Sequence, residues 1–388
     1  MDNNNYLRIR SKPKYFIFLC LYYLLYPICH IVYGRKKNWI ICERGDDAQD
    51  NGYVFYRYLR ENHPEINAIY LIKKSSPDYR KVASLGNVVE FGSKKHFLMM
   101  IGAPTKISSH LFGYSPWVQS TLYYRRHRTR HKHVFLQHGI TKNDLPGFYG
   151  DVCKSIDLFI CGAKPEYEYV KEHFLYPHDV VMYTGFPRFD YLNDYKTNGH
   201  ILFMPTWRRY LSGLSNEQFI DSEFYNEWKA LINNSTLLTI CRDNDIHVDL
   251  YIHHELQRYS SLFKGNDAVN VITFGDNPVQ SLLKESSILV TDFSSVFFDF
   301  AYMHKPIVFY QFDESRYNSG HYAKGYFDYR RDGFGDVVIT TSDVVESLKT
   351  IVSNNFNMSD EYRERTNRFF TLDKQRNCDR VYKRILDL

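Results

Sequence analysis

The chain has 388 residues, of which 44% are hydrophobic and 24% charged, and its formal net charge is +5. This composition is typical of a globular protein and excludes a disordered chain, and the length suits two domains that each bury a core. The seven cysteines are scattered without a CxxC pair, which argues against a disulfide framework and a structural zinc site. The mild positive charge permits an anionic partner, such as a membrane surface or a phosphorylated substrate, without requiring one.

The first distinctive feature in chain order is an uncharged, mostly apolar segment at residues 15–33. Its length just reaches the roughly 20 residues of a membrane-spanning helix, but Pro27 and His30 interrupt it, and no small-residue cleavage site marks a signal peptide. Basic residues flank it on both sides: Arg8, Arg10, Lys12, Lys14, Arg35, Lys36 and Lys37. We therefore expect residues 1–34 to associate with a membrane, as a helix lying in or dipping into the cytoplasmic leaflet. The alternative is a buried first helix of the fold.

Beyond Gly34, short apolar runs alternate with amphipathic stretches, a pattern that predicts βα repeats and a parallel sheet. The first series predicts strands at residues 39–42, 68–72, 88–91, 134–137 and 158–161, and helices at 51–62, 78–84 and 164–173. The second predicts strands at 201–204, 248–252, 269–274, 288–291, 307–310 and 337–339, and helices at 217–232, 278–285, 295–303 and 343–352.

The polar stretch 193–199 separates the two series and is the expected linker. We therefore predict an α/β protein with two doubly wound, Rossmann-like domains, 35–192 and 200–388, that face a central cleft. In such sheets ligands bind at the carboxyl ends of the strands. The helices after residue 359 are expected to pack back across the joint.

Two motifs place polar groups where a predicted strand ends. In residues 288–310 a strand ends at Thr291-Asp292, and Ser294 and Ser295 follow in a turn before a helix. Hydroxyls there either cap the helix or, with its exposed N–H groups, bind phosphate. In residues 135–142 (FLQHGITK), His138 ends a strand and Gly139 allows a close backbone approach. Histidine is a natural general base, although a single histidine is more often structural than catalytic.

Three further motifs repeat this placement. PTWR at 205–208 supplies Thr206 and Arg208, VDLYIHH at 248–254 supplies His253, and TGFPRFD at 184–190 supplies Gly185 and Arg188. Arg208 suits bidentate contact with phosphate, with an ordinary salt bridge as the alternative. Together the motifs bring histidine, arginine and hydroxyl groups to strand ends, where a phosphate-bearing ligand is expected.

These motifs, in this order, resemble the CDP-glycerol glycerophosphotransferase family, the teichoic-acid primase and polymerase type of enzyme. The resemblance also includes ERGDDAQDNGYVFYRYLRE at 43–61 and FDY at 327–329, and it extends from about residue 39 to the C-terminus. The sequence departs from the family pattern at three places. Ile140-Thr141 follows the HG motif, His254 follows His253, and Lys324-Gly325-Tyr326 stands before the FDY motif.

The resemblance implies a GT-B-like fold, with the acceptor on the N-terminal domain and the donor on the C-terminal domain. It implies transfer of glycerol phosphate, or a related polyol phosphate such as ribitol phosphate, from CDP-glycerol or CDP-ribitol to a lipid-linked acceptor at the cytoplasmic membrane face, with release of CMP. The product belongs to teichoic-acid or capsular polysaccharide synthesis. His138 is the implied base, His253 the residue that stabilises charge on the donor phosphates, and the implied donor-binding residues are Thr206, Arg208, Asp292, Ser294 and Ser295. Gly139, Gly185 and Arg188 have supporting roles.

Other functions remain open from the sequence. A glycosyltransferase that uses a nucleotide sugar would share the fold, and an inactive scaffold would share the motifs. The basic, aromatic stretch 123–133 could contact nucleic acid, but no binding module surrounds it, and anionic lipid or a phosphate-bearing acceptor explains it equally well. Asp243-Asn244-Asp245 resembles a metal-binding DxD triplet, which arises easily by chance. We expect no nucleic acid, no metal and no cofactor.

Overall fold

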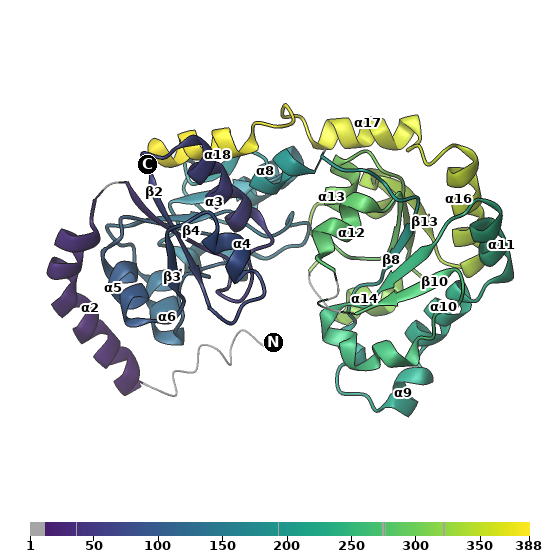
Figure 1. Ribbon diagram of the computed structural model, residues 1–388, viewed down its shortest axis with the longest axis horizontal. Helices are drawn as coiled ribbons and strands as arrows, with labels where there is room; N and C mark the ends of the chain where they lie inside the picture. The colour runs from purple at the N-terminus through teal and green to yellow at the C-terminus, as the bar shows by residue number, and fades with distance from the viewer. Residues whose placement is uncertain (1–11, 36, 193, 274, 276, 321–322) are drawn as a thin grey trace.

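The structure is a computed structural model that describes residues 12–35, 37–192, 194–273, 275, 277–320 and 323–388. It consists of two α/β lobes side by side, each built on one parallel sheet (Figure 1). Several features predicted from the sequence lie outside the described residues: the basic residues Arg8, Arg10 and Lys36, the first residue of the linker and the end of the strand at 274.

The first sheet has seven strands in the order β3-β2-β1-β4-β5-β6-β7, all parallel. Its strands are β1 (Asn38–Cys42), β2 (Asn67–Ile72), β3 (Val88–Glu90), β4 (Thr105–Ser108), β5 (Lys132–Phe135), β6 (Leu158–Cys161) and β7 (Val181–Tyr183). The helices of this part are α2 (Lys12–Tyr33), α3 (Asn51–Asn62), α4 (Tyr79–Ala83), α5 (Lys94–Gly102), α6 (Val118–Arg126), α7 (Pro146–Tyr149), η1 (Asp151–Cys153), α8 (Lys164–His173) and η2 (Pro187–Tyr191).

The second sheet has six parallel strands in the order β10-β9-β8-β11-β12-β13. They are β8 (Ile201–Met204), β9 (Val248–Tyr251), β10 (Val269–Ile272), β11 (Ile288–Thr291), β12 (Ile307–Tyr310) and β13 (Gly335–Val338). The helices are η3 (Arg209–Leu211), α9 (Asn216–Ile220), α10 (Glu223–Ile232), α11 (Ser235–Asp243), η4 (His254–Leu262), α12 (Val279–Glu285), α13 (Phe297–Tyr302), α14 (Glu314–Gly320), α15 (Tyr329–Asp332), α16 (Thr341–Ser353), α17 (Asp360–Phe369) and α18 (Asn377–Leu386).

The predicted fold class, two doubly wound parallel sheets, is confirmed. The prediction succeeded because central strands that are buried on both faces form nearly continuous apolar runs in the sequence. Two strands were not predicted. β4 carries a lysine, Lys106, within four residues, and β7 has only three residues. The predicted helix 217–232 is wrong as a single helix, because Ser222 accepts a hydrogen bond from Tyr225 N and starts α10 anew.

A shared apolar cluster and the C-terminal helix join the two lobes. Phe189 of the first lobe stacks on Tyr302 of the second, with ring centroids 4.2 Å apart. The chain then returns: α17 lies over the second lobe and α18 over the first (Figure 1). In α18, Tyr382 stacks on His63 at 3.7 Å, and Asn377 donates two hydrogen bonds to Asp190. The domain boundaries 35–192 and 200–388 stay a prediction, and this last helix packs on the first lobe.

Helix α2 runs along the outside of the first lobe (Figure 1). By length and composition it could cross a membrane. One face packs on the lobe through Phe18, Tyr22 and Cys29, and Tyr22 shares a hydrogen bond with His131. The opposite face exposes large apolar side chains: Phe16, Ile17, Leu21, Tyr23, Leu24, Ile28, Ile31 and Val32. The helix is therefore only half covered by protein.

Candidate active site

A cleft of about 520 Å³ lies between the two lobes. It is lined by segments that follow the carboxyl ends of strands in both sheets, where α/β sheets bind ligands. Six of the residues predicted from the sequence line it: His138, Gly139, Thr206, His253, Ser294 and Ser295. The structure thus brings together side chains that are up to 157 positions apart in the sequence.

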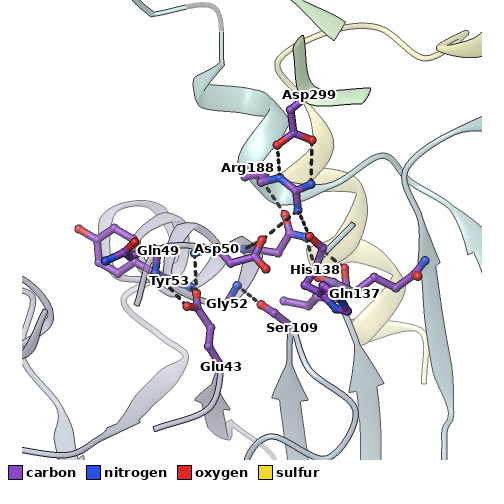
Figure 2. A network of polar contacts seen from close by, with 12 residues as sticks. Glu43, Gln49, Asp50, Gly52, Tyr53, Ser109, Gln137, His138, Arg188 and Asp299 are labelled. Carbon is purple, nitrogen blue, oxygen red and sulfur yellow. Dashed lines mark hydrogen bonds and ion pairs between the residues drawn. The ribbon is translucent and has the colours of Figure 1, made fainter. Parts of the chain in front are cut away.

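Hydrogen bonds from other segments fix the main chain beneath His138. Gln137, the preceding residue, has a positive φ of 56°, a conformation that costs a non-glycine residue energy. Asn51 Nδ2, at the start of α3, donates to the carbonyl of Gln137 at 2.8 Å. Arg188 Nη1 donates to the carbonyl of His138 at 3.2 Å (Figure 2). These contacts hold the strained turn, and with it the direction of the imidazole.

A buried acidic group supports the same turn from below. Glu166 of α8 is fully buried and accepts hydrogen bonds from Gln137 Nε2 at 3.1 Å and from Thr141 N at 2.6 Å. Burial raises the pKa of Glu166 to about 7, although these donors oppose the rise. The whole loop after β5 is therefore anchored on both sides of His138.

The His138 ring opens onto the cleft but is surrounded by cationic and aromatic groups. His110, which follows β4, stacks on it with ring centroids 4.8 Å apart and an interplanar angle of 8°. Desolvation by the surrounding protein lowers the pKa of His138 to about 4, and the charges of Arg44 and Arg188 lower it further. At neutral pH the imidazole is uncharged and can accept a proton. No sequence pattern pointed to His110, because β4 was not predicted.

The second lobe faces this ring with hydroxyls and a further histidine. Gly139 and Ser295 meet across the cleft: a Cβ on Gly139 would lie 3.3 Å from Ser295 Oγ. The predicted helix start is shifted, since α13 begins at Phe297, and Ser294 only accepts a long bond of 3.4 Å from Val296 N. Helix capping therefore does not use up these hydroxyls, and Ser294 and Ser295 line the cleft.

Both histidines after β9 reach the cleft. His253 is partly buried, and its Nδ1 accepts a hydrogen bond from Glu255 N at 3.3 Å. Desolvation, followed by the neighbouring His254, lowers the pKa of His253 to about 4. His254 is more exposed and pairs with Glu255 at 3.5 Å. The more buried position and fixed ring make His253 the better placed of the two to meet a ligand.

Arg208 and Asp292, which are predicted to bind the donor, lie outside the cleft lining. Both side chains are fully buried below the cleft, and Arg208 Nη2 lies 2.8 Å from Asp292 Oδ2. Arg208 also makes a bidentate pair with Asp313, at 2.7 and 2.9 Å. Asp292 in turn accepts a hydrogen bond from Thr206 N at 2.9 Å. The pair orients the strand ends that carry Thr206 and the serines, and it presents no guanidinium face to the cleft.

Lys142 supplies a positive charge that the sequence analysis did not single out, although it lies in the FLQHGITK motif. Its side chain lines the cleft and is 8% exposed, and its Nζ has no ion pair or hydrogen bond among the described residues. Nζ lies 5.6 Å from the ring centroid of Tyr329. Desolvation lowers the pKa of Lys142 to about 8, against the attraction of Asp292. A buried, unpaired ammonium at a cleft is a candidate partner for an anion.

The two remaining predicted residues lie at the joint between the lobes. Arg188 is buried and makes a bidentate pair with Asp299 of α13, at 2.7 and 2.8 Å, and a third contact with Asp50 at 2.9 Å (Figure 2). Gly185 has φ +73°, and a Cβ there would lie 2.0 Å from Asn377 Oδ1 of α18. Arg188 therefore connects the lobes behind His138, and Gly185 accommodates the returning helix.

Metal-ligating side chains do not gather in the part of the chain that the structure describes: no group of three or more His, Cys, Asp or Glu residues is placed to hold an ion. Asp243, Asn244 and Asp245 are exposed around the end of α11. The expected absence of a metal stays a prediction.

Comparison with known proteins identifies the family. The family model of the CDP-glycerol:poly(glycerophosphate) glycerophosphotransferases matches residues 24–387. The chain belongs to this family. The minor teichoic acid biosynthesis protein GgaB of Bacillus subtilis is 32% identical over 369 residues, which are 92% of this chain and 40% of that protein. The teichoic acid glycerol-phosphate transferase of Staphylococcus aureus is 26% identical over 391 residues, which are 90% of this chain and 94% of that protein.

The solved structure of the wall teichoic acid polymerase TagF shares the GT-B fold of this glycerophosphotransferase family member. It aligns with a TM-score of 0.70 at 17% identity, covering 100% of this chain and 98% of that one. The chain spans less than half the length of the first two curated relatives it matches, 40% of GgaB and 48% of the teichoic acid poly(glycerol phosphate) polymerase of Bacillus subtilis.

Proposed function

We propose that this chain transfers glycerol phosphate from CDP-glycerol to a hydroxyl of an acceptor and releases CMP. The observation that carries the proposal is one cleft with an uncharged histidine and a buried lysine on the first lobe and a histidine and two serines on the facing lobe. Family membership and the names of the relatives, which refer to glycerol phosphate and teichoic acid, support this donor over a nucleotide sugar. A variant of TagF was solved with CDPG.

In the proposed reaction, a ring nitrogen of His138 accepts the proton of the acceptor hydroxyl. The oxygen attacks the β-phosphorus of CDP-glycerol, the new O–P bond forms, and the bond from that phosphorus to the bridging oxygen breaks. CMP leaves with the bonding electrons. A pKa of about 4 makes His138 by itself a weak base, and the negative donor phosphates raise that pKa toward neutrality.

The residues assigned to the donor stabilise the negative charge of its pyrophosphate from fixed positions. Such transfers depend chiefly on positioning and electrostatic neutralisation. We assign Lys142 and His253 to the pyrophosphate, with Thr206, Ser294 and Ser295 as hydrogen-bond donors. Arg208 and Asp292 act beneath them by fixing the strand ends.

The membrane part of the proposal rests on α2. Its half-covered geometry fits a helix that lies on the cytoplasmic leaflet with its exposed apolar face in the lipid, and fits a spanning helix less well. We propose that the acceptor is lipid-linked and that the product is a teichoic acid or a capsular polysaccharide. CDP-ribitol is the alternative donor.

The test is CMP release by the membrane-bound full chain supplied with CDP-glycerol, CDP-ribitol, a UDP-sugar or a GDP-sugar, in the presence of a membrane fraction that supplies acceptor. We expect turnover of CDP-glycerol and a loss of about 10²- to 10⁴-fold in His138→Gln, the usual contribution of a general base. His178→Gln, at an exposed position, is the matched control and keeps full activity. Turnover of a nucleotide sugar alone, or full activity in His138→Gln, contradicts the proposal.

A further inference from the structure

A second cavity lies away from the cleft, between α2 and the first lobe. It measures about 540 Å³, within the range of about 300–1,000 Å³ typical of small-molecule sites. Apolar side chains of three helices or their flanks line it: Ile17, Phe18, Leu21, Phe97, Leu98 and Trp117. The cavity is thus a groove with a hydrocarbon-like wall on each side.

The packing of α2 explains why the groove exists. The two helices α2 and α5 touch closely at Cys29 and Gly102, where a Cβ on Gly102 would lie 2.2 Å from the Cys29 carbonyl oxygen. Toward their N-terminal ends they separate, and Ile17 and Phe97 line the resulting gap. Well-packed interiors do not leave such apolar gaps open. The groove therefore has the form of a site that something else fills.

Charge and position indicate what fills it. Lys14 and Lys94, both exposed, lie among the lining residues and place two positive charges at a mostly apolar groove, whose other polar side chains are those of Ser93 and Gln119. Ile17 and Leu21 belong to both the groove and the exposed apolar face of α2, so the groove is continuous with that face. An occupant needs an apolar chain and an anionic group, which is the chemistry of an anionic membrane lipid.

The groove also lies at the catalytic edge of the first sheet. Gly92 and Ser93 follow the end of β3, and Trp117 follows the loop after β4. His138 follows β5, and because all these strands are parallel, their carboxyl ends share one edge. A lipid held in the groove would therefore have its headgroup on the same side of the lobe as the proposed base.

We propose that this groove binds one hydrocarbon chain of an anionic membrane lipid, with the lipid phosphate on Lys14 and Lys94. This binding goes beyond lying on a membrane, because it extracts a single chain into the protein. It is independent of the group transferred in the cleft, and it can be measured without any donor.

The probe is a lysophosphatidic acid with bromines on its acyl chain, titrated into the full chain below its critical micelle concentration. Bromine quenches tryptophan on contact, and Trp117 lines the groove. We expect saturable quenching that disappears in Trp117→Phe. Ile17→Ser and Ile28→Ser form a matched pair, since both positions are exposed on α2, by 56% and 62%, and only Ile17 lines the groove. Ile17→Ser should weaken binding about fivefold, and Ile28→Ser should leave it unchanged.

A second arm tests the charge. Replacing Lys14 or Lys94 by serine should weaken binding of the anionic probe about fivefold each, and should leave a zwitterionic lysophosphatidylcholine unaffected. Equal losses in Ile17→Ser and Ile28→Ser would show adsorption to the helix surface and overturn the proposal. So would an absence of saturable quenching, or quenching that survives in Trp117→Phe. A large gain in binding when residues 1–11 are deleted would show that the chain's own N-terminus is the occupant.

Discussion

Replacing Arg188 by methionine is expected to destabilise the protein more at pH 8 than at pH 5. The Arg188 side chain is 6% exposed, and its carboxylate partners Asp299 and Asp50 are 7% and 19% exposed. Methionine fills much of the same space but leaves both carboxylates without their cation. Removing one partner of a buried ion pair costs about 3–5 kcal/mol, and this is the loss expected at pH 8.

The pH dependence follows from Asp50. Burial raises its pKa to about 6, above the value of about 3.9 for an unfolded chain, and Arg188 is the largest influence that opposes the rise. Removing a close opposite charge raises the pKa of a carboxyl further, by about 1–3. This corresponds to about 1.4–4 kcal/mol in the free energy of ionising the buried group. A carboxyl with a raised folded pKa binds more protons when folded, so its protonation favours the folded state at low pH and this contribution is lost as pH rises. In the variant the pKa of Asp50 lies higher still, so stability continues to fall with pH above pH 6. At pH 5 the Asp50 carboxyl is protonated and uncharged, so burying it without Arg188 lowers the free energy of unfolding little.

The assay is urea unfolding of wild type and variant at pH 5 and pH 8, with midpoint and slope measured at each. Arg57→Met is the matched control: Arg57 pairs with Glu61, both are more than 40% exposed, and the expected loss is below about 1 kcal/mol at either pH. The transfer assay should also show a lower kcat, because Arg188 holds the carbonyl of His138. An equal loss of stability at the two pH values, or a loss no greater than that of the control, would refute this reasoning.

Two further predictions concern the cleft itself. The kcat/KM of the wild type should rise with pH through the pKa of His138, about 4, and fall again above about pH 8 as Lys142 loses its proton. The variant Lys142→Arg keeps its charge and should move this alkaline fall to higher pH. A fall at the same pH in the variant would assign it to another group. Gly139→Ala should lower kcat/KM several-fold, because its Cβ would press on Ser295 across the cleft, whereas Gly147→Ala, with open space around it, should have no effect. Equal activity of the two alanine variants would show that the close approach at Gly139 is not needed.

Local pattern was sufficient to predict most strands of the two sheets. Runs of buried apolar residues and the turns that follow them are properties of neighbouring residues, so the βα alternation and the placement of His138, His253 and the serines after strands could be read directly. The same reasoning failed where a local signal was missing. The strand β4 (TKIS) contains only one apolar residue, Ile107, beside Lys106, so it was missed, and so was His110, which follows it and stacks on His138.

The partners of each side chain were not predictable in this way. Arg208 reads as a phosphate ligand because it follows a strand, yet Asp313, 105 positions later, occupies its guanidinium. Lys142 reads as an ordinary polar residue, yet it is buried where the lobes meet, with its Nζ 5.6 Å from the ring centroid of Tyr329 of the second lobe. Contacts of this kind depend on how the two lobes face each other, which no local pattern encodes.

The apolar N-terminal segment shows the division most clearly. Its composition and length determined that residues 15–33 form a helix suited to a membrane, and the structure confirms the helix as α2. The sequence could not determine which face stays free. That depends on which residues find partners on α5 and α6, folded from positions some 80 to 110 residues later, and so only the tertiary structure decides that Phe18 and Tyr22 are buried while Ile17 and Ile28 remain exposed.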